Sequence, residues 1–192
     1  MKKIVLLGAG GHCKSCIDVI LASKQFEIVA ILGKNSELNR PILNFKVNGN
    51  DGDIAKYLVK DCSFLITVGQ IKSNATRLKL YNKLIDLKAS FATVISPLAY
   101  VSDFAQIGQG SIVMHHAIIN ADAKIGQNCI INSKALIEHD ASISDHCHIS
   151  TAAVVNGEVK VGQNSFVGSH ATTKQGIEIP QSSFIKAGAL VK

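Results

Sequence analysis

The C-terminal half of the chain, from residue 99 onward, repeats every six residues. One position of each hexad carries a branched aliphatic side chain, and two positions earlier lies a second column of mostly small residues. The aliphatic column comprises Val101, Ile107, Val113, Ile119, Ile125, Ile131, Ile137, Ile143, Ile149, Val155, Val161, Val167, Ile179, Ile185 and Val191. A single polar residue, Thr173, interrupts it. A fixed period of this kind must be recognised before any single strand is assigned, because it dictates the architecture.

The six-residue period predicts strands and not helices. Six is not a multiple of 3.6, so a helix would spread the column around its circumference, whereas in an extended chain every sixth side chain points to the same side. Three strand-and-turn segments of six residues would make one coil of about 18 residues, with the aliphatic column filling the interior. Residues 18 apart should then stack, as Cys129 on Cys147. An antiparallel sandwich is disfavoured, because it would need irregular hairpin turns.

The first ninety residues lack the hexad and alternate between apolar runs and segments with helical spacing. This alternation predicts a small Rossmann-like parallel sheet covered on both faces, an α/β domain over residues 1–92 that precedes a parallel β-helix over residues 93–192. The expected strands are Lys2–Leu7, Phe26–Leu32 and Phe64–Val68, and the expected helices lie after Gly11, at Asp51–Val59 and at Ile71–Lys88.

A glycine-rich turn, Gly8-Ala9-Gly10-Gly11-His12, joins the first strand to the first helix. Backbone donors and the positive end of the helix dipole make such a turn a phosphate site. The dinucleotide fingerprint is incomplete, because its third glycine position is Cys13 and the second strand ends in Gly33-Lys34 with no acid to hold a ribose. We therefore expect a nucleotide diphosphate in preference to NAD, and a tight turn without a ligand is the alternative.

Composition narrows the class of protein. The net charge is +6 without clusters of Lys and Arg, which favours small anionic ligands over nucleic acid. The five cysteines, an odd number with no second Cys-x-x-Cys to complete a zinc site, indicate reduced thiols and a cytoplasmic location. Cys13 and Cys16 are interpreted as packing residues. The N-terminal apolar run is too short for a signal peptide or a membrane span.

Histidines concentrate in the repeat, and their phase relative to the aliphatic column separates them. His139 follows a strand at the point where the wall turns, beside Asp140, and a neighbouring carboxylate raises the basicity of an imidazole. Gly157 lies 18 residues later, one coil above, where its backbone N–H could approach a substrate oxygen. His148 precedes an interior residue and should face away from the core. The other repeat histidines, His115, His116, His146 and His170, are expected to be turn or interface residues.

In combination, several motifs resemble one family over essentially the whole chain. They are the glycine turn, Ile131-Asn132-Ser133, Ile137-Glu138-His139-Asp140, His148-Ile149-Ser150, Val155-Asn156-Gly157 and Phe166-Val167-Gly168-Ser169. The chain is similar to the hexapeptide-repeat sugar O-/N-acyltransferases of bacterial surface-glycan synthesis, of the sialic acid O-acetyltransferase and UDP-amino-sugar N-acetyltransferase type. The resemblance implies a left-handed parallel β-helix, acetyl-CoA as co-substrate, no metal and a homotrimer with the site between neighbouring prisms.

Residue by residue, the resemblance implies that His139 is a general base acting by direct transfer, with Asp140, where relatives carry Glu, increasing its basicity. It implies that His148 and the N–H of Gly157 meet the acetyl carbonyl. Ser169 and Ala187 correspond to contacts of the coenzyme arm. The substrate-binding set in the first domain is Gly10, Gly11, His12, Gly33, Lys34 and Gly69.

Three departures from the family pattern leave alternatives open. Gly33-Lys34 replaces acidic residues of the UDP-sugar relatives, so the nucleotide is undetermined. Thr173 suggests a local bulge. The chain stops at Lys192 before the segment that closes the prism in relatives, so either coenzyme affinity is reduced or the closure is made otherwise. The leading expectation is an N-acetyltransferase acting on a nucleotide-linked amino sugar. An O-acetyltransferase of sialic acid or a related nonulosonic acid is the alternative, and a non-catalytic scaffold is the third.

Overall fold

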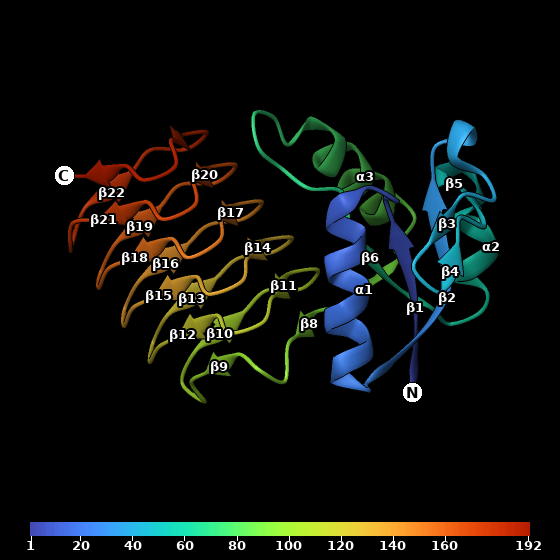
Figure 1. The fold of residues 1–192 in the computed structure, drawn as a ribbon, viewed down its shortest axis with the longest axis horizontal. Helices are drawn as coiled ribbons and strands as arrows, with labels where there is room; N and C mark the ends of the chain where they lie inside the picture. The colour runs from blue at the N-terminus through green and yellow to red at the C-terminus, as the bar shows by residue number, and fades with distance from the viewer. The chain divides into compact units, whose positions relative to one another are not determined.

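The computed structural model describes residues 1–192 as two compact units, Met1–Ala92 and Thr93–Lys192. Figure 1 shows a layered α/β unit and a stack of coils. The predicted α/β domain followed by a parallel β-helix is confirmed. None of the helices combines the length and apolarity that crossing a bilayer requires.

The N-terminal unit is a five-stranded parallel sheet in the order β5-β2-β1-β6-β7. Its elements are β1 Lys2–Leu7, α1 Gly11–Ser23, β2 Phe26–Gly33, the 3-10 turn η1 Asn35–Glu37, β3 Pro41–Ile42, β4 Phe45–Lys46, β5 Gly49–Asn50, the 3-10 turn η2 Asp51–Asp53, α2 Ala55–Leu58, β6 Ser63–Ile66, α3 Ala75–Asp86 and β7 Ser90–Phe91. The chain leaves β1 toward β2 on one side and returns to β6 on the other. Loops at the carboxyl ends of β1 and β6 therefore diverge there, which opens a crevice.

Alternation along the strands explains why both faces of this sheet are buried. Val5 and Leu7 of β1 pack in one cluster with Leu84 of α3. The alternate residues of β1, Ile4 and Leu6, point to the opposite face and are also fully buried. A sheet that is apolar on both faces must be covered on both, which is the doubly wound arrangement.

Two predicted helices of this unit are shorter than expected. The segment predicted as one helix at Asp51–Val59 divides into η2 and α2, because Asn50 caps a 3-10 turn with its side chain. The second helix starts at Ala75, where the expected start was Ile71, and ends at Asp86. The short hairpin of β3 and β4 was not predicted.

The C-terminal unit consists of two-residue strands that follow each other in six-residue steps (Figure 1). The strands are β8 Val94–Ile95, β9 Tyr100–Val101, β10 Gln106–Ile107, β11 Ile112–Val113, β12 Ile118–Ile119, β13 Lys124–Ile125, β14 Ile130–Ile131, β15 Leu136–Ile137, β16 Ser142–Ile143, β17 His148–Ile149, β18 Val154–Val155, β19 Lys160–Val161, β20 Phe166–Val167, β21 Thr172–Thr173, β22 Glu178–Ile179, β23 Phe184–Ile185 and β24 Leu190–Val191.

These strands form the three walls of a prism. The walls are the parallel sheets β10-β13-β16-β19-β22, β8-β11-β14-β17-β20-β23 and β9-β12-β15-β18-β21-β24. Each strand pairs with the strand 18 residues later, as Ile119 pairs with Ile137. The aliphatic column lies inside, where Ile131, Ile137 and Val155 have no exposed surface. The second column, exemplified by Cys129 and Cys147, is buried with it.

The turns share a conformation that hydrophobic periodicity does not reveal. The second turn residue has a positive φ, in the left-handed region, at every corner from Gly110 to Gly188: His116, Asp122, Asn128, Lys134, Asp140, His146, Ala152, Glu158, Asn164, His170 and Ser182, together with Gly110, Gly176 and Gly188. This conformation turns each corner sharply. It also fixes the direction in which the side chain of that residue leaves the corner.

The expected bulge at Thr173 is wrong. Thr172 pairs with Val154 below and with Leu190 above, in the regular register of its sheet. Thr173 points into the prism and is 1% exposed, so it takes the place of the missing aliphatic residue.

Candidate active site

His139 lies on the corner that follows β15, and its partner is the next residue. Asp140 has a φ of 59°, and this turn conformation directs its carboxylate back toward the imidazole. Oδ2 of Asp140 lies 2.7 Å from Nδ1 of His139. Asp is one methylene shorter than Glu, yet from this backbone it reaches the ring. With Nδ1 donating to the carboxylate, Nε2 carries the lone pair and can accept a proton.

Negative charge surrounds this imidazole. The hydrogen bond that the His139 ring donates to the Asp140 carboxylate raises the pKa of His139 above its usual value, and desolvation opposes the shift in part. The Glu138 and Glu158 carboxylates act in the same direction as Asp140. The side chains of His139 and Asp140 are about half exposed, 54% and 55%. The arrangement therefore provides a solvent-accessible base that is stronger than a free histidine.

Gly157 lies directly over the ring of His139, one coil above. A Cβ at Gly157 would lie 2.9 Å from Cε1 and 3.0 Å from Nε2 of His139, so any larger residue would push the imidazole aside. The Gly157 carbonyl accepts the N–H of Gly176 at 2.9 Å. The N–H of Glu158 binds the carbonyl of His139 at 3.1 Å. The N–H of Gly157 takes no part in the ladder between coils, so it is available to a bound molecule beside Nε2.

His148 faces away from the core, as its sequence phase predicted, but it is buried. It points out of the prism from β17, yet it is only 6% exposed. Its Nε2 lies 3.1 Å from Nδ2 of Asn132, and the edge of its ring contacts Phe166, with centroids 5.2 Å apart. Phe166 in turn stacks on Phe184. Sequence phase correctly excludes His148 from the interior, and the aromatic side chain 18 residues later, on the next coil, covers its outer face.

Ser169 and Ala187 lie one above the other on the corner that follows β20 and β23. The N–H of Gly188 binds the carbonyl of Ser169 at 2.8 Å, which joins the two turns. Ser169 Oγ lies 2.9 Å from Oγ of Ser150. This is a different corner from that of His139, on the wall that carries His148. The two serine hydroxyls and the joined turns therefore form an edge with polar groups along the stack, and the expected coenzyme contacts of Ser169 and Ala187 stay a prediction.

The N-terminal unit contains a pocket of about 650 Å³ at the carboxyl ends of its strands. Its lining includes all six residues expected to bind substrate: Gly10, Gly11, His12, Gly33, Lys34 and Gly69. They come from the ends of β1, β2 and β6, which meet at the crevice where the strand order reverses.

The glycines of the first turn differ in whether the structure would tolerate a side chain. Gly8 has a φ of +116°, and a Cβ there would meet Cγ2 of Val68 at 2.5 Å, so its backbone demands glycine. At Gly10 and Gly11 a Cβ would meet nothing within 4 Å. Gly10 is the N-cap of α1 and has no side-chain cap, and the first turn of the helix holds no acid. Open space over uncapped N–H groups suits an anionic group of a ligand.

Further residues of this pocket carry charge that the sequence motif did not reveal. Glu37 lines it and accepts the N–H of Lys34 at 2.9 Å. Glu37 also pairs with Arg40 at 2.8 Å, and Arg40 donates to the carbonyl of Ala9 in the glycine turn. Asp51 completes the charged lining. Only the fold brings these residues to the glycine turn, because they follow a different strand.

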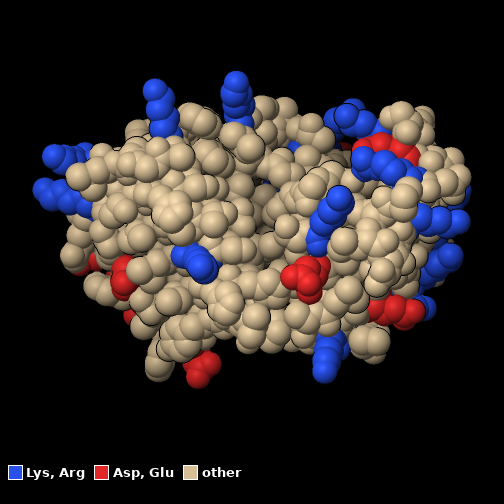
Figure 2. All heavy atoms as spheres, in the orientation of Figure 1, with Lys and Arg blue, Asp and Glu red and all other residues tan.

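Charge is distributed unevenly between the two units. Residues 1–92 hold 14 Lys and Arg against 7 Asp and Glu, whereas residues 93–192 hold 6 against 7. The net charge of +6 thus originates in the N-terminal unit. Figure 2 shows basic side chains gathered on this face over the region of β2 to β5. A basic N-terminal unit favours an anionic ligand there.

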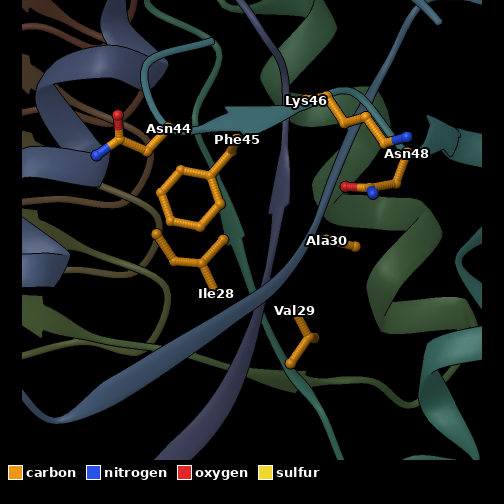
Figure 3. Close-up of a pocket in the computed structure, with 7 residues that line it drawn as sticks. All are labelled: Ile28, Val29, Ala30, Asn44, Phe45, Lys46 and Asn48. Atoms are coloured by element: carbon orange, nitrogen blue, oxygen red, sulfur yellow. The ribbon is translucent and has the colours of Figure 1, made fainter. Parts of the chain in front are cut away.

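A second hollow, of about 460 Å³, lies over β2 and the β3–β4 hairpin. Figure 3 shows Ile28 and Phe45 side by side on one side of it and Lys46 and Asn48 on the other. Lys46 is the one ionisable residue in its lining, which holds no carboxylate, histidine, cysteine or hydroxyl side chain. It therefore offers no paired acid and base.

The remaining histidines and cysteines do not join either site. His115 Nδ1 lies 2.6 Å from Oγ of Ser96, and His146 Nδ1 lies 3.1 Å from Nδ2 of Asn128. His116 and His170 are exposed turn residues. The interpretation of Cys13 and Cys16 as packing residues is confirmed, because both are fully buried free thiols and burial raises the pKa of each. No group of three or more His, Cys, Asp and Glu side chains is arranged to hold a metal ion.

Comparison with known families matches the two units separately. Residues 3–84 match the PglD N-terminal domain, and residues 93–139 match the bacterial transferase hexapeptide family, with six repeats. A curated relative, the UDP-N-acetylbacillosamine N-acetyltransferase of Bacillus subtilis strain 168, is 36% identical over 123 residues. That match covers 59% of this chain and 52% of the relative, about half of its length.

Solved structures resemble the whole chain. A mutant of perosamine N-acetyltransferase from Caulobacter crescentus, in complex with CoA and GDP-perosamine, is 30% identical with a TM-score of 0.92, covering 100% of this chain and 89% of that one. The acetyltransferase domain of PglB from Neisseria gonorrhoeae is 26% identical with a TM-score of 0.91, covering 100% and 92%. The same domain in complex with acetyl coenzyme A is 25% identical with a TM-score of 0.89, covering 99% and 92%.

Replacement of Asp140 tests the electrostatics of this site without any substrate. In Asp140→Asn the carboxylate that stabilises the imidazolium is lost, so the pKa of His139 should fall toward its ordinary value and the ring should lose its proton at a lower pH. A titration of the His139 ring signals by NMR measures this shift directly.

Asp122→Asn is the matched control. Asp122 occupies the same left-handed turn position one coil below, beside Ala121 and not beside a histidine. It should leave the pKa of His139 unchanged. An equal pKa in the Asp140→Asn and wild-type proteins would contradict the assigned partner.

Proposed function

This chain belongs to the hexapeptide-repeat sugar acyltransferases, and on that premise we propose that it is an acetyl-CoA-dependent N-acetyltransferase acting on a nucleotide-linked amino sugar. The observation that carries the proposal is the corner at which His139, paired with Asp140, lies under the backbone of Gly157. A base and a fixed N–H donor side by side are the two groups that acyl transfer to an amine requires.

The proposed reaction is a direct transfer. Nε2 of His139 removes a proton from the acceptor amine as its nitrogen attacks the thioester carbonyl, and the new C–N bond forms. The N–H of Gly157 stabilises the negative charge that develops on the carbonyl oxygen. The intermediate then breaks its C–S bond, and the protonated His139 supplies the proton to the departing sulfur. No covalent acyl-enzyme forms, and no metal takes part.

The coenzyme is proposed to lie along the corner that holds Ser169 and Ala187, with His148 near the acetyl carbonyl. Support comes from the polar edge that these turns form and from relatives crystallised with CoA or acetyl coenzyme A. His148 accepts a hydrogen bond from Asn132 at Nε2, so Nδ1 carries its proton and acts as a donor.

The nucleotide of the acceptor is proposed to bind in the pocket of the N-terminal unit. Its diphosphate would meet the open N–H groups after Gly10 and Gly11, and His12, Gly33, Lys34 and Gly69 would line the remainder of the pocket. The structure of one relative contains GDP-perosamine, and the name of another relative includes a UDP-linked sugar. Both purine and pyrimidine nucleotides therefore occur among the relatives. We propose a nucleotide-linked amino sugar as the acceptor and do not assign its nucleobase.

A homotrimer in the cytoplasm is part of the proposal. The outward positions of one wall are mostly apolar, and Tyr100, Ile118 and Leu190 are 60%, 40% and 63% exposed. The corresponding positions of the β10–β22 wall are polar: Gln106, Lys124, Ser142, Lys160 and Glu178. An apolar stripe on one wall suits a subunit interface. All five cysteines are buried free thiols, in keeping with a reducing compartment.

The proposal is tested by thiol release from acetyl-CoA against UDP-, dTDP- and GDP-amino sugars, free sialic acid and CMP-sialic acid. His139→Ala should lower kcat about 10²–10⁴-fold, the contribution of a general base, while the assembly persists. His116→Asn is the control, because His116 is an exposed turn residue whose positive φ Asn also adopts. Turnover with sialic acid alone would favour the O-acetyltransferase alternative. No turnover with any acceptor would favour the non-catalytic scaffold. A normal kcat in His139→Ala would contradict the assignment of His139 as the general base.

The acceptor pocket is tested by Gly10→Asp. An N-cap Asp is favourable for a helix, and a Cβ at Gly10 has free space, so the fold should be at least as stable as the wild type. The added carboxylate would occupy the site proposed for the diphosphate and repel it. Binding of UDP and GDP, measured by calorimetry, should therefore weaken about tenfold or more.

Gln25→Glu adds the same charge on an exposed residue after the other end of α1 and should leave nucleotide binding unchanged. Equal nucleotide affinity in the Gly10→Asp and wild-type proteins would place the nucleotide elsewhere.

A further inference from the structure

One hydrogen bond departs from the ladder that joins the coils. At the residue that follows each strand, the backbone N–H binds the carbonyl of the interior residue one coil above. This holds at thirteen of fourteen such positions: Ser96, Ser102, Gly108, Met114, Asn120, Gly126, Asn132, Glu138, Ser144, Ser150, Gly162, Gly168 and Lys174. At Asn156 the N–H binds Oγ1 of Thr173 instead, at 2.9 Å.

The exchange leaves the carbonyl of Thr173 without its usual backbone donor. Nδ2 of Asn156 donates to this carbonyl instead, at 2.6 Å. Two bonds, one from the backbone and one from the side chain of Asn156, thus replace the usual single one. In the same place only Val154 and Thr172 remain as a regular pair of β18 and β21, where the neighbouring coils have two pairs.

The exchange occurs at Asn156, directly before Gly157. The amide nitrogen of Gly157 is bonded to the carbonyl carbon of Asn156, so the conformation of Asn156 sets the direction of the Gly157 N–H. The carbonyl of Gly157 and the N–H of Glu158 are held by the coils above and below. The short segment that bears the proposed donor is therefore fixed on both sides, and Thr173 fixes one of them.

Packing alone does not account for a threonine here. The residue is 1% exposed in a column that is otherwise Val or Ile, and a buried hydroxyl costs free energy unless it is hydrogen-bonded. Valine has nearly the same shape and would give the regular ladder found at the other positions. The hydroxyl thus changes the geometry beside the site without improving the interior.

We propose that Thr173 is a positioning residue, whose hydroxyl, together with the side chain of Asn156, orients the Gly157 N–H toward the carbonyl oxygen of the acetyl group. This inference rests on the proposed acetyl transfer. Thr173 itself touches no substrate. Its effect is on the stabilisation of charge in the transition state, and not on the basicity of His139, which depends on Asp140.

The experiment compares Thr173→Val with Thr173→Ser in the full-length protein. The valine variant loses the hydroxyl, keeps the shape and restores the aliphatic column, so its melting temperature should equal or exceed that of the wild type. Its kcat should fall about 10- to 100-fold, because a misplaced catalytic group of this kind costs on that order, with KM for both substrates within twofold. Thr173→Ser keeps the hydroxyl and should retain kcat within threefold. The pH profile should not move in either variant.

An NMR measurement provides a readout that does not need activity. The amide signals of Asn156 and Gly157 should shift in Thr173→Val and stay near their wild-type positions in Thr173→Ser. Full kcat in a folded Thr173→Val protein would overturn the inference, as would an equal loss in both variants or a displaced pH profile. If the wild-type protein turns over no acceptor, the proposed function fails. The amide shifts then still decide whether Thr173 orients the segment.

Discussion

The hydrogen bonds between successive coils of the C-terminal unit fix residue i beneath residue i+18, and the candidate site depends on this register. A shift by one residue would exchange interior and exterior side chains on a whole wall. The aliphatic column opposes such a shift, because Ile137 and Val155 would leave an interior in which they have no exposed surface. The same register brings Gly157 over His139. The precision of the site therefore depends on a core that is mostly aliphatic.

Periodicity was sufficient to predict the β-helix because its signal is redundant over many coils. It was also sufficient to place Gly157 above His139, since both lie at the same phase. The N-terminal helices were predicted less well, because Asn50 and Asn74 begin elements within polar stretches where hydrophobic spacing does not mark a boundary. The register of 18 residues places Phe166 over His148, but the burial of the His148 ring also depends on how the two side chains pack, which the period does not give.

Three features of the site could not be read from residue types. The left-handed conformation of Asp140 lets a shorter acid reach the imidazole, and only the turn geometry shows this. Glu37 and Arg40 reach the glycine turn through the fold of the loop after β2. Thr173, which interrupts the column in sequence, keeps its place in the wall and changes instead a single hydrogen bond beside the proposed donor.

Acyl transfer at the point where Gly157 lies over His139 is tested most directly by the rate of acetyl transfer in Gly157→Ala. The φ of Gly157 lies outside the left-handed region and the clash is with the end of a half-exposed side chain, so the variant should fold. The methyl group would displace the imidazole, and kcat should fall about a hundredfold or more, as misplacement of a catalytic group predicts. Wild-type kcat in a folded Gly157→Ala protein would show that the reaction takes place elsewhere.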